Sequence, residues 1–260
     1  MKKQWRVALA NLILTMSAIS IGAAQEPESE PLVTDRPDFT ESPLVVPQGR
    51  VQVEGGYTYT RSGDEREHSL GEVLVRVPVS RKAELRFGVP SYLRQSAAGG
   101  RAVGFDNAFL GAKFALSPGG GKKPATALLV GTVLPTGARF VRENGLQPEA
   151  ILAASWELCP TVALSVNAGY ARPSDGGVRF NQFLGSLSAG FTISDKWGAF
   201  AEVFGMSKAD ASGKSAKYAD GGVTYLLNND FQLDARAGIG VNNHAGGPDF
   251  FVGFGASRRF

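Results

Sequence analysis

The stretch RVQVEGGYTYT at residues 50–60 decides the fold class of this 260-residue chain. Side chains alternate between the two faces of a β-strand, so apolar residues at every second position mark a strand with one apolar face. The apolar positions that share one face here are Val51, Val53, Tyr57 and Tyr59. The opposite face carries charged or polar residues, namely Arg50, Gln52, Glu54, Thr58 and Thr60. The pattern therefore predicts a strand that separates an apolar from a polar environment.

The same unit, about ten residues of alternating character followed by turn residues, repeats to the end of the sequence. Almost nothing in the sequence indicates helix. No apolar run of 18 or more residues follows residue 24, which excludes a bundle of membrane-spanning helices. We predict twelve strands, at residues 50–60, 69–79, 83–93, 104–116, 124–134, 149–158, 161–171, 182–193, 197–206, 217–227, 231–241 and 249–260.

The connections between these strands alternate in length. The shorter ones lie at residues 80–82, 117–123, 158–161, 194–196 and 228–230. The longer ones lie at residues 61–68, 94–103, 135–148, 172–181, 207–216 and 242–248. Transmembrane barrels alternate in this way, with short turns at the periplasmic end and long loops outside. A soluble β-sandwich has no reason to do so.

The strand face opposite the apolar one is small or charged nearly everywhere in the sequence. An aqueous lumen behind a lipid-facing wall explains that pairing of faces, and closure of the sheet leaves no unsatisfied strand edge in hydrocarbon. Residues 125–134 are an exception because they are apolar on both faces. The sequence thus predicts an all-β fold, a transmembrane antiparallel up-and-down β-barrel of about twelve strands at residues 50–260.

The first residues predict an export signal. Lys2, Lys3 and Arg6 precede an apolar stretch at residues 7–21, and small residues then run to Ala24, after which we predict cleavage. An uncleaved anchor helix is the alternative, but the stretch is at the short end of the roughly 17 to 25 residues that span a bilayer. Cleavage removes three of the 27 basic residues and none of the 24 acidic ones, so the rest of the chain is formally neutral. Net charge therefore gives no reason to expect a nucleic-acid partner.

Phe260 ends the sequence directly after a strand-like run. Bacterial outer-membrane proteins commonly finish on an aromatic residue that the barrel-assembly machinery recognises. We therefore expect Phe260 to be an assembly signal, the barrel-assembly machinery to be a partner, and the bacterial outer membrane with its lipid to be the location of the protein.

The segment TDRPDFTESPLVVPQGRVQVEGGYTY (residues 34–59) resembles the opening signature of the family described as MetA-pathway of phenol degradation proteins, often labelled transporters. Later pieces match the same family's pattern: ELRFGVP (84–90), VLPTGA (133–138), GAFAEVFG (198–205), YADGGVTYLL (218–227) and QLDARAGIGVN (232–242). The resemblance covers nearly the whole chain after the signal. It implies an outer-membrane β-barrel linked to uptake of hydrophobic or aromatic compounds. The family's usual aromatic residue near the end is replaced here by Arg258.

Charged residues at inward-facing positions are the first candidates for function. Their mixed signs suggest a salt-bridged lumen network that tunes selectivity rather than a filter for one sign of ion. The alternative is structural, since in a barrel narrower than open porins such residues can simply fill and neutralise the interior. The candidates are Glu54, Glu72, Arg76, Glu84, Arg86, Lys113, Glu157, Glu202, Asp220, Asp234 and Arg236.

Residues 25–49 form a second candidate region. Five prolines between residues 27 and 47 forbid a continuous helix or a central strand there. One hypothesis is an irregular segment that enters the periplasmic mouth and constricts it, with Arg36 and Asp38 paired to wall charges. The alternative is a periplasmic tether, and residues 26–31 are expected to be disordered. The plug candidates are Asp35, Arg36, Asp38, Phe39 and Glu41.

Enzymatic and cofactor sites find little support in the sequence. The histidines, His68 and His244, both fall in predicted external loops, and no Gly-x-Ser-x-Gly motif accompanies them. Cys159 is the single cysteine, so disulfides cannot stabilise the chain. The glycines at residues 119–121 lack the phosphate-loop pattern. We therefore expect no catalytic residue, no metal and no cofactor.

The expected function is a passive outer-membrane channel for small molecules, hydrophobic or aromatic ones among them. A small-molecule solute is then a partner, besides lipid. The alternative function is a barrel without transport, an adhesin or interaction scaffold whose long external loops bind a partner.

Overall fold

The strands begin and end close to the positions that the period of two predicts. The computed structural model describes residues 30–243 and 247–260. Its strands are β1 (Gln52–Ser62), β2 (Glu65–Ser80), β3 (Ala83–Gly88), β4 (Tyr92–Ala97), β5 (Gly100–Phe105), β6 (Phe109–Gly120), β7 (Lys123–Val133), β8 (Gln147–Cys159), β9 (Val162–Ala171), β10 (Ser174–Asp175), β11 (Val178–Arg179), β12 (Gln182–Thr192), β13 (Trp197–Met206), β14 (Ala216–Asn228), β15 (Phe231–Asn243) and β16 (Phe250–Arg259).

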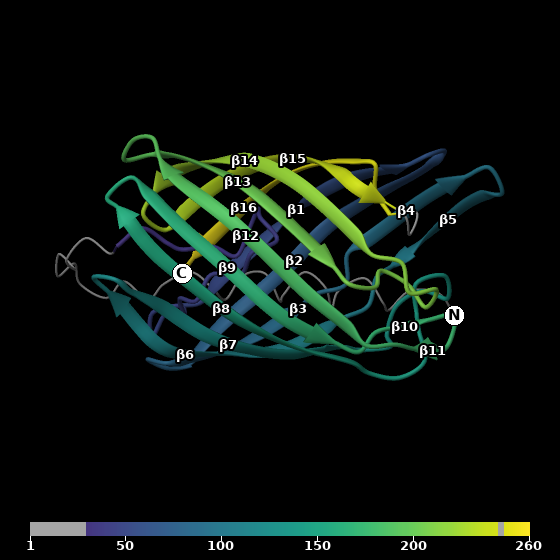
Figure 1. The fold of residues 1–260 in the computed structure, drawn as a ribbon, viewed down its shortest axis with the longest axis horizontal. Helices are drawn as coiled ribbons and strands as arrows, with labels where there is room; N and C mark the ends of the chain where they lie inside the picture. Colours follow the sequence, from purple (N-terminus) through teal and green to yellow (C-terminus); the bar gives the residue numbers. More distant parts are fainter. Residues whose placement is uncertain (1–29, 244–246) are drawn as a thin grey trace, which may run out of the picture.

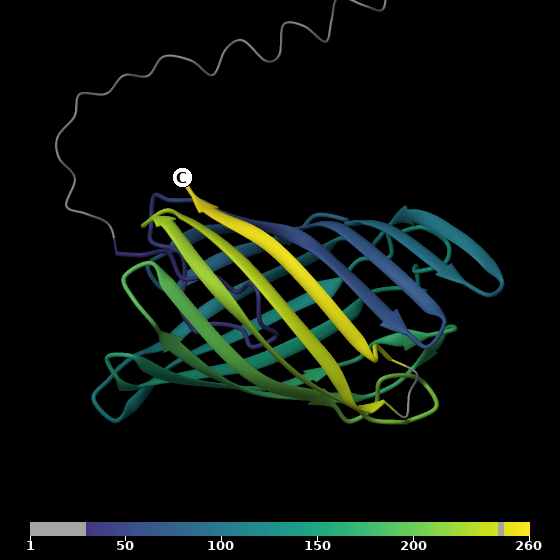
Figure 2. The same ribbon diagram turned by 90° about the horizontal axis from the view of Figure 1, so that it is seen from above.

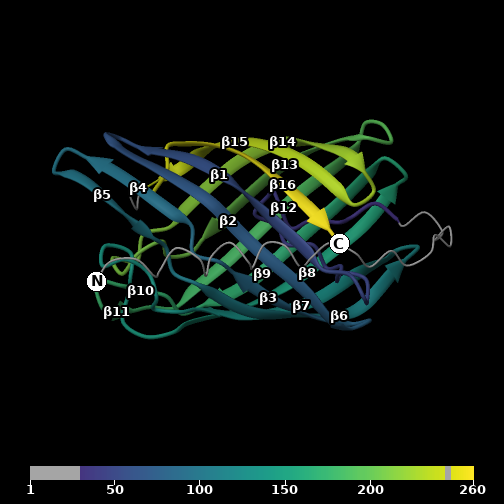
Figure 3. The ribbon, with the colours of Figure 1, turned by 180° about the vertical axis from the view of Figure 1, so that it is seen from behind.

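The strands form one closed antiparallel sheet. Each wall strand pairs with its neighbours in the chain, and β1 pairs with both β2 and β16, which closes the ring. Fourteen strands belong to this sheet, but β3 with β4 and β5 with β6 are each one wall strand interrupted by a short break. The result is the predicted barrel of twelve strands, which run obliquely around the wall in the opposite views of Figures 1 and 3.

Two of the long external loops that the sequence predicts are in fact strand. Residues 61–68 extend the β1–β2 hairpin to a turn at Gly63 and Asp64, and residues 94–103 form most of the β4–β5 hairpin, which projects beyond the rim (Figure 1). Strands outside the lipid still pair their backbones, but no hydrocarbon imposes an apolar face on them. Their mixed polar sequence therefore resembles a loop. Within the loop at residues 172–181, β10 and β11 form a small separate hairpin.

The two faces of the wall have the predicted character. On β16 the outward positions carry exposed Phe250, Val252 and Phe254, while Ser257 and Arg259 on the other face are buried. Aromatic pairs lie near both rims: Tyr170 with Phe183 and Tyr92 with Phe105 towards the long loops, and Trp197 with Tyr225 towards the short turns. Aromatic girdles of this kind mark the two interfaces of a membrane barrel.

The stretch that is apolar on both faces, residues 125–134, has a structural explanation. Leu128 and Val130 face outward and are exposed, whereas Ala127 and Leu129 face inward and are buried with Ala153 of β8. A local apolar cluster thus replaces polar side chains on this part of the inner wall.

The segment of residues 30–51, before β1, enters the barrel between exposed ends, and Leu32 and Val46 are buried within it. Figure 2 shows this segment, in purple, within the wall towards the end that carries the C-terminus. The short turns gather at the same end, which is the periplasmic end in barrels of this type. The expected signal peptide, residues 1–24, falls outside the described residues. Within those residues, no helix has the length and apolar character needed to cross a membrane.

An outward position in the middle of a strand should be far less tolerant of charge than one at the rim. Val223 lies in the middle of β14 and Val241 near the long-loop end of β15, and both are exposed on the outer face. We expect Val223→Arg to lower the free energy of unfolding in lipid vesicles by about 2–4 kcal/mol and Val241→Arg by about 0–1 kcal/mol. Urea titrations in vesicles measure both. Equal losses would contradict this placement of the hydrocarbon band.

The lumen network and the N-terminal segment

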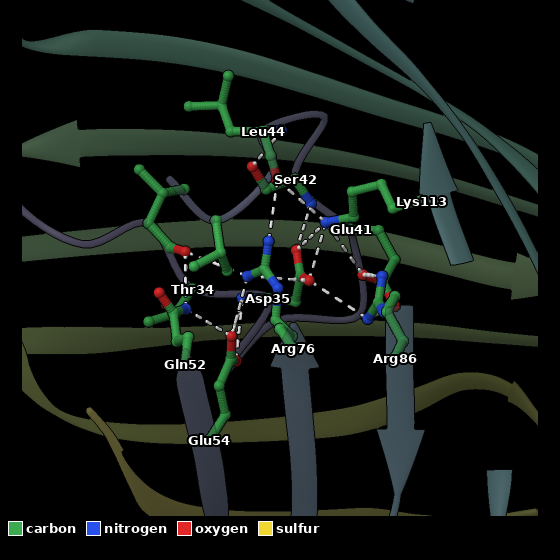
Figure 4. A network of polar contacts seen from close by, with 12 residues as sticks. Thr34, Asp35, Glu41, Ser42, Leu44, Gln52, Glu54, Arg76, Arg86 and Lys113 are labelled. Atoms are coloured by element: carbon green, nitrogen blue, oxygen red, sulfur yellow. Dashed lines mark hydrogen bonds and ion pairs between the residues drawn. The ribbon is translucent and has the colours of Figure 1, made fainter. Parts of the chain in front are cut away.

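Buried ion pairs join the N-terminal segment to the inner wall, and Arg76 of β2 lies among three of them. Its guanidinium is 3.1 Å from Asp35, 3.0 Å from Glu54 and 2.8 Å from Glu84. These four side chains are all almost fully buried. Asp35 comes from the N-terminal segment, and the other three come from adjacent strands of the wall. Figure 4 shows how the charged ends converge.

Asp35 receives positive charge from three wall strands. Besides Arg76, Lys113 of β6 donates to it at 2.9 Å and Arg86 of β3 lies at 3.2 Å. Burial alone would raise the pKa of the Asp35 carboxyl, but the charges of Arg76, Lys113 and Arg86 outweigh burial and hold the pKa well below its ordinary value. Glu41 adds a second carboxylate from the segment, because the two terminal guanidinium nitrogens of Arg86 donate to it, at 2.8 and 3.0 Å. This paired arrangement is the strong form of a charge-assisted hydrogen bond.

Pairing between the strands explains why these charges meet. Arg76 lies opposite Arg86 in the β2–β3 register, and Glu84 lies opposite Lys113 in the β3–β6 register. Opposite residues of an antiparallel pair share a face, so all four side chains point inward. We call Asp35, Glu41, Glu54, Arg76, Glu84, Arg86 and Lys113 the lumen network.

The backbone of the segment also depends on wall carboxylates. Buried N–H groups need acceptors, and a segment without regular structure cannot supply them from its own backbone. The amide of Arg36 donates to Glu54 at 3.0 Å, that of Val46 to Glu84 at 2.8 Å, and that of Phe39 to Glu202 at 2.7 Å. The wall acids therefore position the segment as well as balancing charge.

Arg36 lies against the consecutive wall strands β15, β16, β1 and β2, next to the lumen network. Its guanidinium donates to Glu72 at 2.9 Å and lies 3.4 Å from Asp234. A Cβ on Gly56 or Gly255 would collide with this guanidinium, so glycine at these two wall positions provides the room that it occupies. Glu72 has a φ of 43°, a left-handed conformation that a non-glycine residue seldom adopts. It lies in a bulge of β2, between the residues paired with Gly56 and Glu54 of β1, and its carboxylate meets Arg36.

The tip of the segment contacts β12 and β13. Asp38 accepts a hydrogen bond from Ser188 at 3.2 Å, and Thr40 contacts both Ser186 and Glu202 through its hydroxyl. Burial raises the pKa of Asp38 well above its ordinary value, and the charge of Glu202 raises it further. Segment and wall are thus in contact on nearly all sides, from β1 to β15.

Aromatic rings continue from the tip along the inner wall. Phe39 stacks on Phe204 of β13 with ring centroids 4.4 Å apart and an interplanar angle of 8°. Phe204 then stacks on Tyr218 of β14 at 5.0 Å, and Tyr218 contacts Phe251 of β16 edge-on at 6.5 Å. The guanidinium of Arg236 lies 5.3 Å from the Phe251 ring centre. We call Phe39, Phe204, Tyr218 and Phe251 the aromatic ladder.

Two cavities flank the segment near the short-turn end. One of about 470 Å³ borders Arg36 and Asp38, and another of about 840 Å³ borders Thr40 and Leu44. Glu157 lines both of them. Space for small solutes thus remains between the segment and the wall.

The structure brings most of the predicted site residues together. Glu54, Arg76, Glu84, Arg86 and Lys113 meet Asp35 and Glu41 in the lumen network, while Glu72 and Asp234 meet Arg36. Glu202 lies opposite Asp220 in the β13–β14 register, and Arg236 approaches the aromatic ladder. Glu157 stands apart, exposed at the cavities. Phe260 exchanges two backbone hydrogen bonds with Val51, at 2.8 and 3.2 Å, next to the closing seam. Its role as an assembly signal stays a prediction.

Several residues of the lumen were not predicted from the sequence. Gln52 donates to Glu54 at 2.8 Å, and Thr40 fixes the tip of the segment. The rings of Phe204 and Tyr218 were missed because apolar side chains were expected to face lipid. The sequence did indicate their orientation. Phe204 is two residues from Glu202 and Tyr218 is two residues from Asp220, so each ring shares a strand face with an inward-facing carboxylate.

Comparison with known proteins agrees with this architecture. The family model described as "Putative MetA-pathway of phenol degradation" matches residues 34–260. The chain belongs to this family. The match begins inside the N-terminal segment and runs through all twelve strands of the barrel. The comparison with curated proteins finds no match.

Solved structures share the fold of this family member. An outer membrane channel from Pseudomonas putida F1 gives a TM-score of 0.63 at 15% identity, over 84% of this chain and 97% of that one. The NanC porin gives 0.55 at 13% identity, over 80% and 98% of the two chains. The KdgM porin, solved with disordered oligogalacturonate, gives 0.50 at 11% identity, over 81% and 99%. The chain is an outer-membrane β-barrel.

Removing the central cation of the lumen network should be far more costly than removing a cation at the rim. Arg76→Met leaves Asp35, Glu54 and Glu84 buried without their shared partner, and we expect a loss of about 3–5 kcal/mol in the free energy of unfolding. The matched control is Arg50→Met, whose partly exposed pair with Asp230 should contribute about 0–1 kcal/mol. Urea unfolding in vesicles measures both variants. Equal effects would contradict the central role of Arg76.

Proposed function

We propose that the protein is a passive outer-membrane channel for small molecules, constricted from within by its own N-terminal segment. The observation that carries this proposal is the position of residues 32–46 inside a closed barrel, where paired charges hold the segment and cavities lie beside it. An interior reserved for structure alone would need no such spaces. The shared fold of the porins and of the P. putida channel supports a channel role.

Hydrophobic or aromatic solutes are the class that this interior favours. The aromatic ladder offers stacked faces along the inner wall, and aromatic rings prefer to stack or meet edge-on with other rings. Phe39 takes one end of that row in the present structure, at the place where a flat solute would stack. Arg236 lies over the Phe251 ring, and Glu202 and Asp220 share the inner face of β13 and β14 with Phe204 and Tyr218, so these charges would act on a solute at the ladder.

The segment is the part of the channel that controls its width. Deleting residues 25–41 removes Asp35, Glu41 and the tip, and we expect single-channel conductance in planar bilayers to rise several-fold. Because the deletion leaves Arg76, Arg86 and Lys113 without these partners, folding is checked by circular dichroism. The milder variant Phe39→Ala keeps every charge and should give a smaller rise. Unchanged conductance in both folded variants would overturn the constriction.

The alternative function, an interaction scaffold without transport, makes a different prediction in the same experiment. A scaffold that uses its external loops should show neither conductance nor solute flux, with or without the segment. That result would overturn the channel proposal itself.

Current block by a small aromatic acid should depend on the ladder. We expect benzoate to reduce ion current more strongly than cyclohexanecarboxylate, which has the same charge and no aromatic face. Phe204→Leu should weaken the benzoate block by a factor of about 2 to 13, the equivalent of roughly 0.5–1.5 kcal/mol for an aromatic pair. Phe250→Leu, a change on the outer face, is the matched control. Equal block by the two acids would contradict the aromatic preference.

A further inference from the structure

A groove on the outer wall is a second candidate site. Ser186, Phe204 and Tyr218 of the wall also border it, although their side chains contact the N-terminal segment or belong to the aromatic ladder. The groove lies over β12, β13 and β14, which are neighbours in the wall, at the ends of these strands that adjoin the loop of residues 207–215 (Figure 1). Its volume is about 570 Å³, within the usual range of roughly 300–1,000 Å³ for ligand sites. The long-loop end is external, so the groove lies at the outer leaflet of the membrane.

Two facing glycines make the floor of the groove. Gly185 of β12 lies directly opposite Gly205 of β13, so neither strand has an outward side chain at that level. Leu187, Val203 and Val241, all exposed on the outer face, border the depression. The surface that lipid meets here is therefore both apolar and concave.

One lysine lines the external end of this groove, and two more lie in the adjoining loop. The stem of Lys217 lies over Gly205, since a Cβ on that glycine would be 3.2 Å from the lysine Cγ. Long lysine side chains place apolar stems against a surface and direct their ammonium groups to water. Lys208 and Lys214 are exposed in the adjoining loop. Among the described residues, no carboxylate lies within 4.0 Å of any of these three ammonium groups, and Asp210 of the same loop interacts with Lys214 at a longer distance.

Backbone hydrogen bonds hold the lysine-bearing loop at this edge. The amide of Ala209 donates to the carbonyl of Lys214 at 2.7 Å, and the side chain of Gln182 donates to the carbonyl of Lys208. Gln182 begins β12, the strand that carries Gly185. The positive charges are thus attached to the strands that form the groove.

We propose that this groove binds a phosphorylated glycolipid of the outer leaflet, with an acyl chain along Gly185 and Gly205 and phosphate at Lys208, Lys214 and Lys217. The groove is apolar where the acyl region lies and cationic where headgroups begin, which matches a lipid that carries anionic phosphate. Clusters of basic residues beside a membrane surface attract anionic lipid headgroups. A neutral lipid would leave the lysines unused, and a soluble anion would leave the apolar floor unused.

Native mass spectrometry of the full barrel in detergent tests the proposal with purified lipid A as the probe. Dephosphorylated lipid A and phosphatidylglycerol are the comparison lipids. We expect diphosphorylated lipid A to bind more tightly than either. Each lysine is expected to contribute about fivefold to the affinity. The triple variant K208E/K214E/K217E should therefore weaken binding by about 100-fold or more. Lys196→Glu, in an exposed short turn at the opposite rim, is the charge control and should leave binding unchanged.

Filling the floor provides an independent variant. A Cβ on Gly185 meets nothing within 4 Å, so Gly185→Leu fits the wall and occupies the groove. We expect it to weaken lipid A binding several-fold, while Ala237→Leu, elsewhere on the outer face, does not. Wild-type affinity in the triple variant or in Gly185→Leu would overturn the proposal, as would equal binding of dephosphorylated lipid A. Equal binding of phosphatidylglycerol would overturn the assignment to a glycolipid. Conductance is read separately, because the groove and the lumen lie on opposite faces.

Discussion

The pairing of Asp35 with three wall cations is the interaction on which the interior depends. Arg76, Arg86 and Lys113 come from three different strands, and Asp35 comes from a segment with no regular structure. Each charge would be very costly to bury alone. Together they make a set in which each charge has a partner. The buried charges of the segment thus need those of the wall as partners. The wall cations likewise need the carboxylates of the segment.

This dependence accounts for the distribution of charge across the chain. The wall contributes cations on β2, β3 and β6, and the segment contributes Asp35 and Glu41 to meet them. On the adjoining strands β15 to β2 the relation reverses, because Arg36 of the segment meets Glu72 and Asp234 of the wall. Glu54, Glu84 and Glu202 also accept backbone amides from the segment. Side chains of the wall thus accept the backbone hydrogen bonds of the segment, as neighbouring strands do for one another in a sheet.

The sequence predicts the wall well and the interior only in part. Hydrophobic alternation locates all twelve wall strands, because lipid on one side and a polar interior on the other impose the period of two. It fails at residues 61–68 and 94–103, where no lipid acts on the hairpins. Alternation also shows that Glu84 and Lys113 face inward. It cannot show that Asp35 meets Lys113, because that contact depends on how an irregular segment folds back across the barrel. Proline density excluded regular structure in the segment without choosing between lumen and periplasm.

Both ends of the described segment lie at the same mouth of the barrel. Leu32 is held to Asn229 in a short turn by a 2.8 Å backbone hydrogen bond, and Val51 is bonded to Phe260 beside the seam. The segment therefore enters the interior and returns through the same mouth. It does not pass through the barrel from one end to the other. It could therefore leave the lumen through the short-turn mouth while the sheet stays closed. Its C-terminal end would stay attached to β1. Movement of the segment out of the lumen would thus need its ion pairs to break, but no strand pair of the wall.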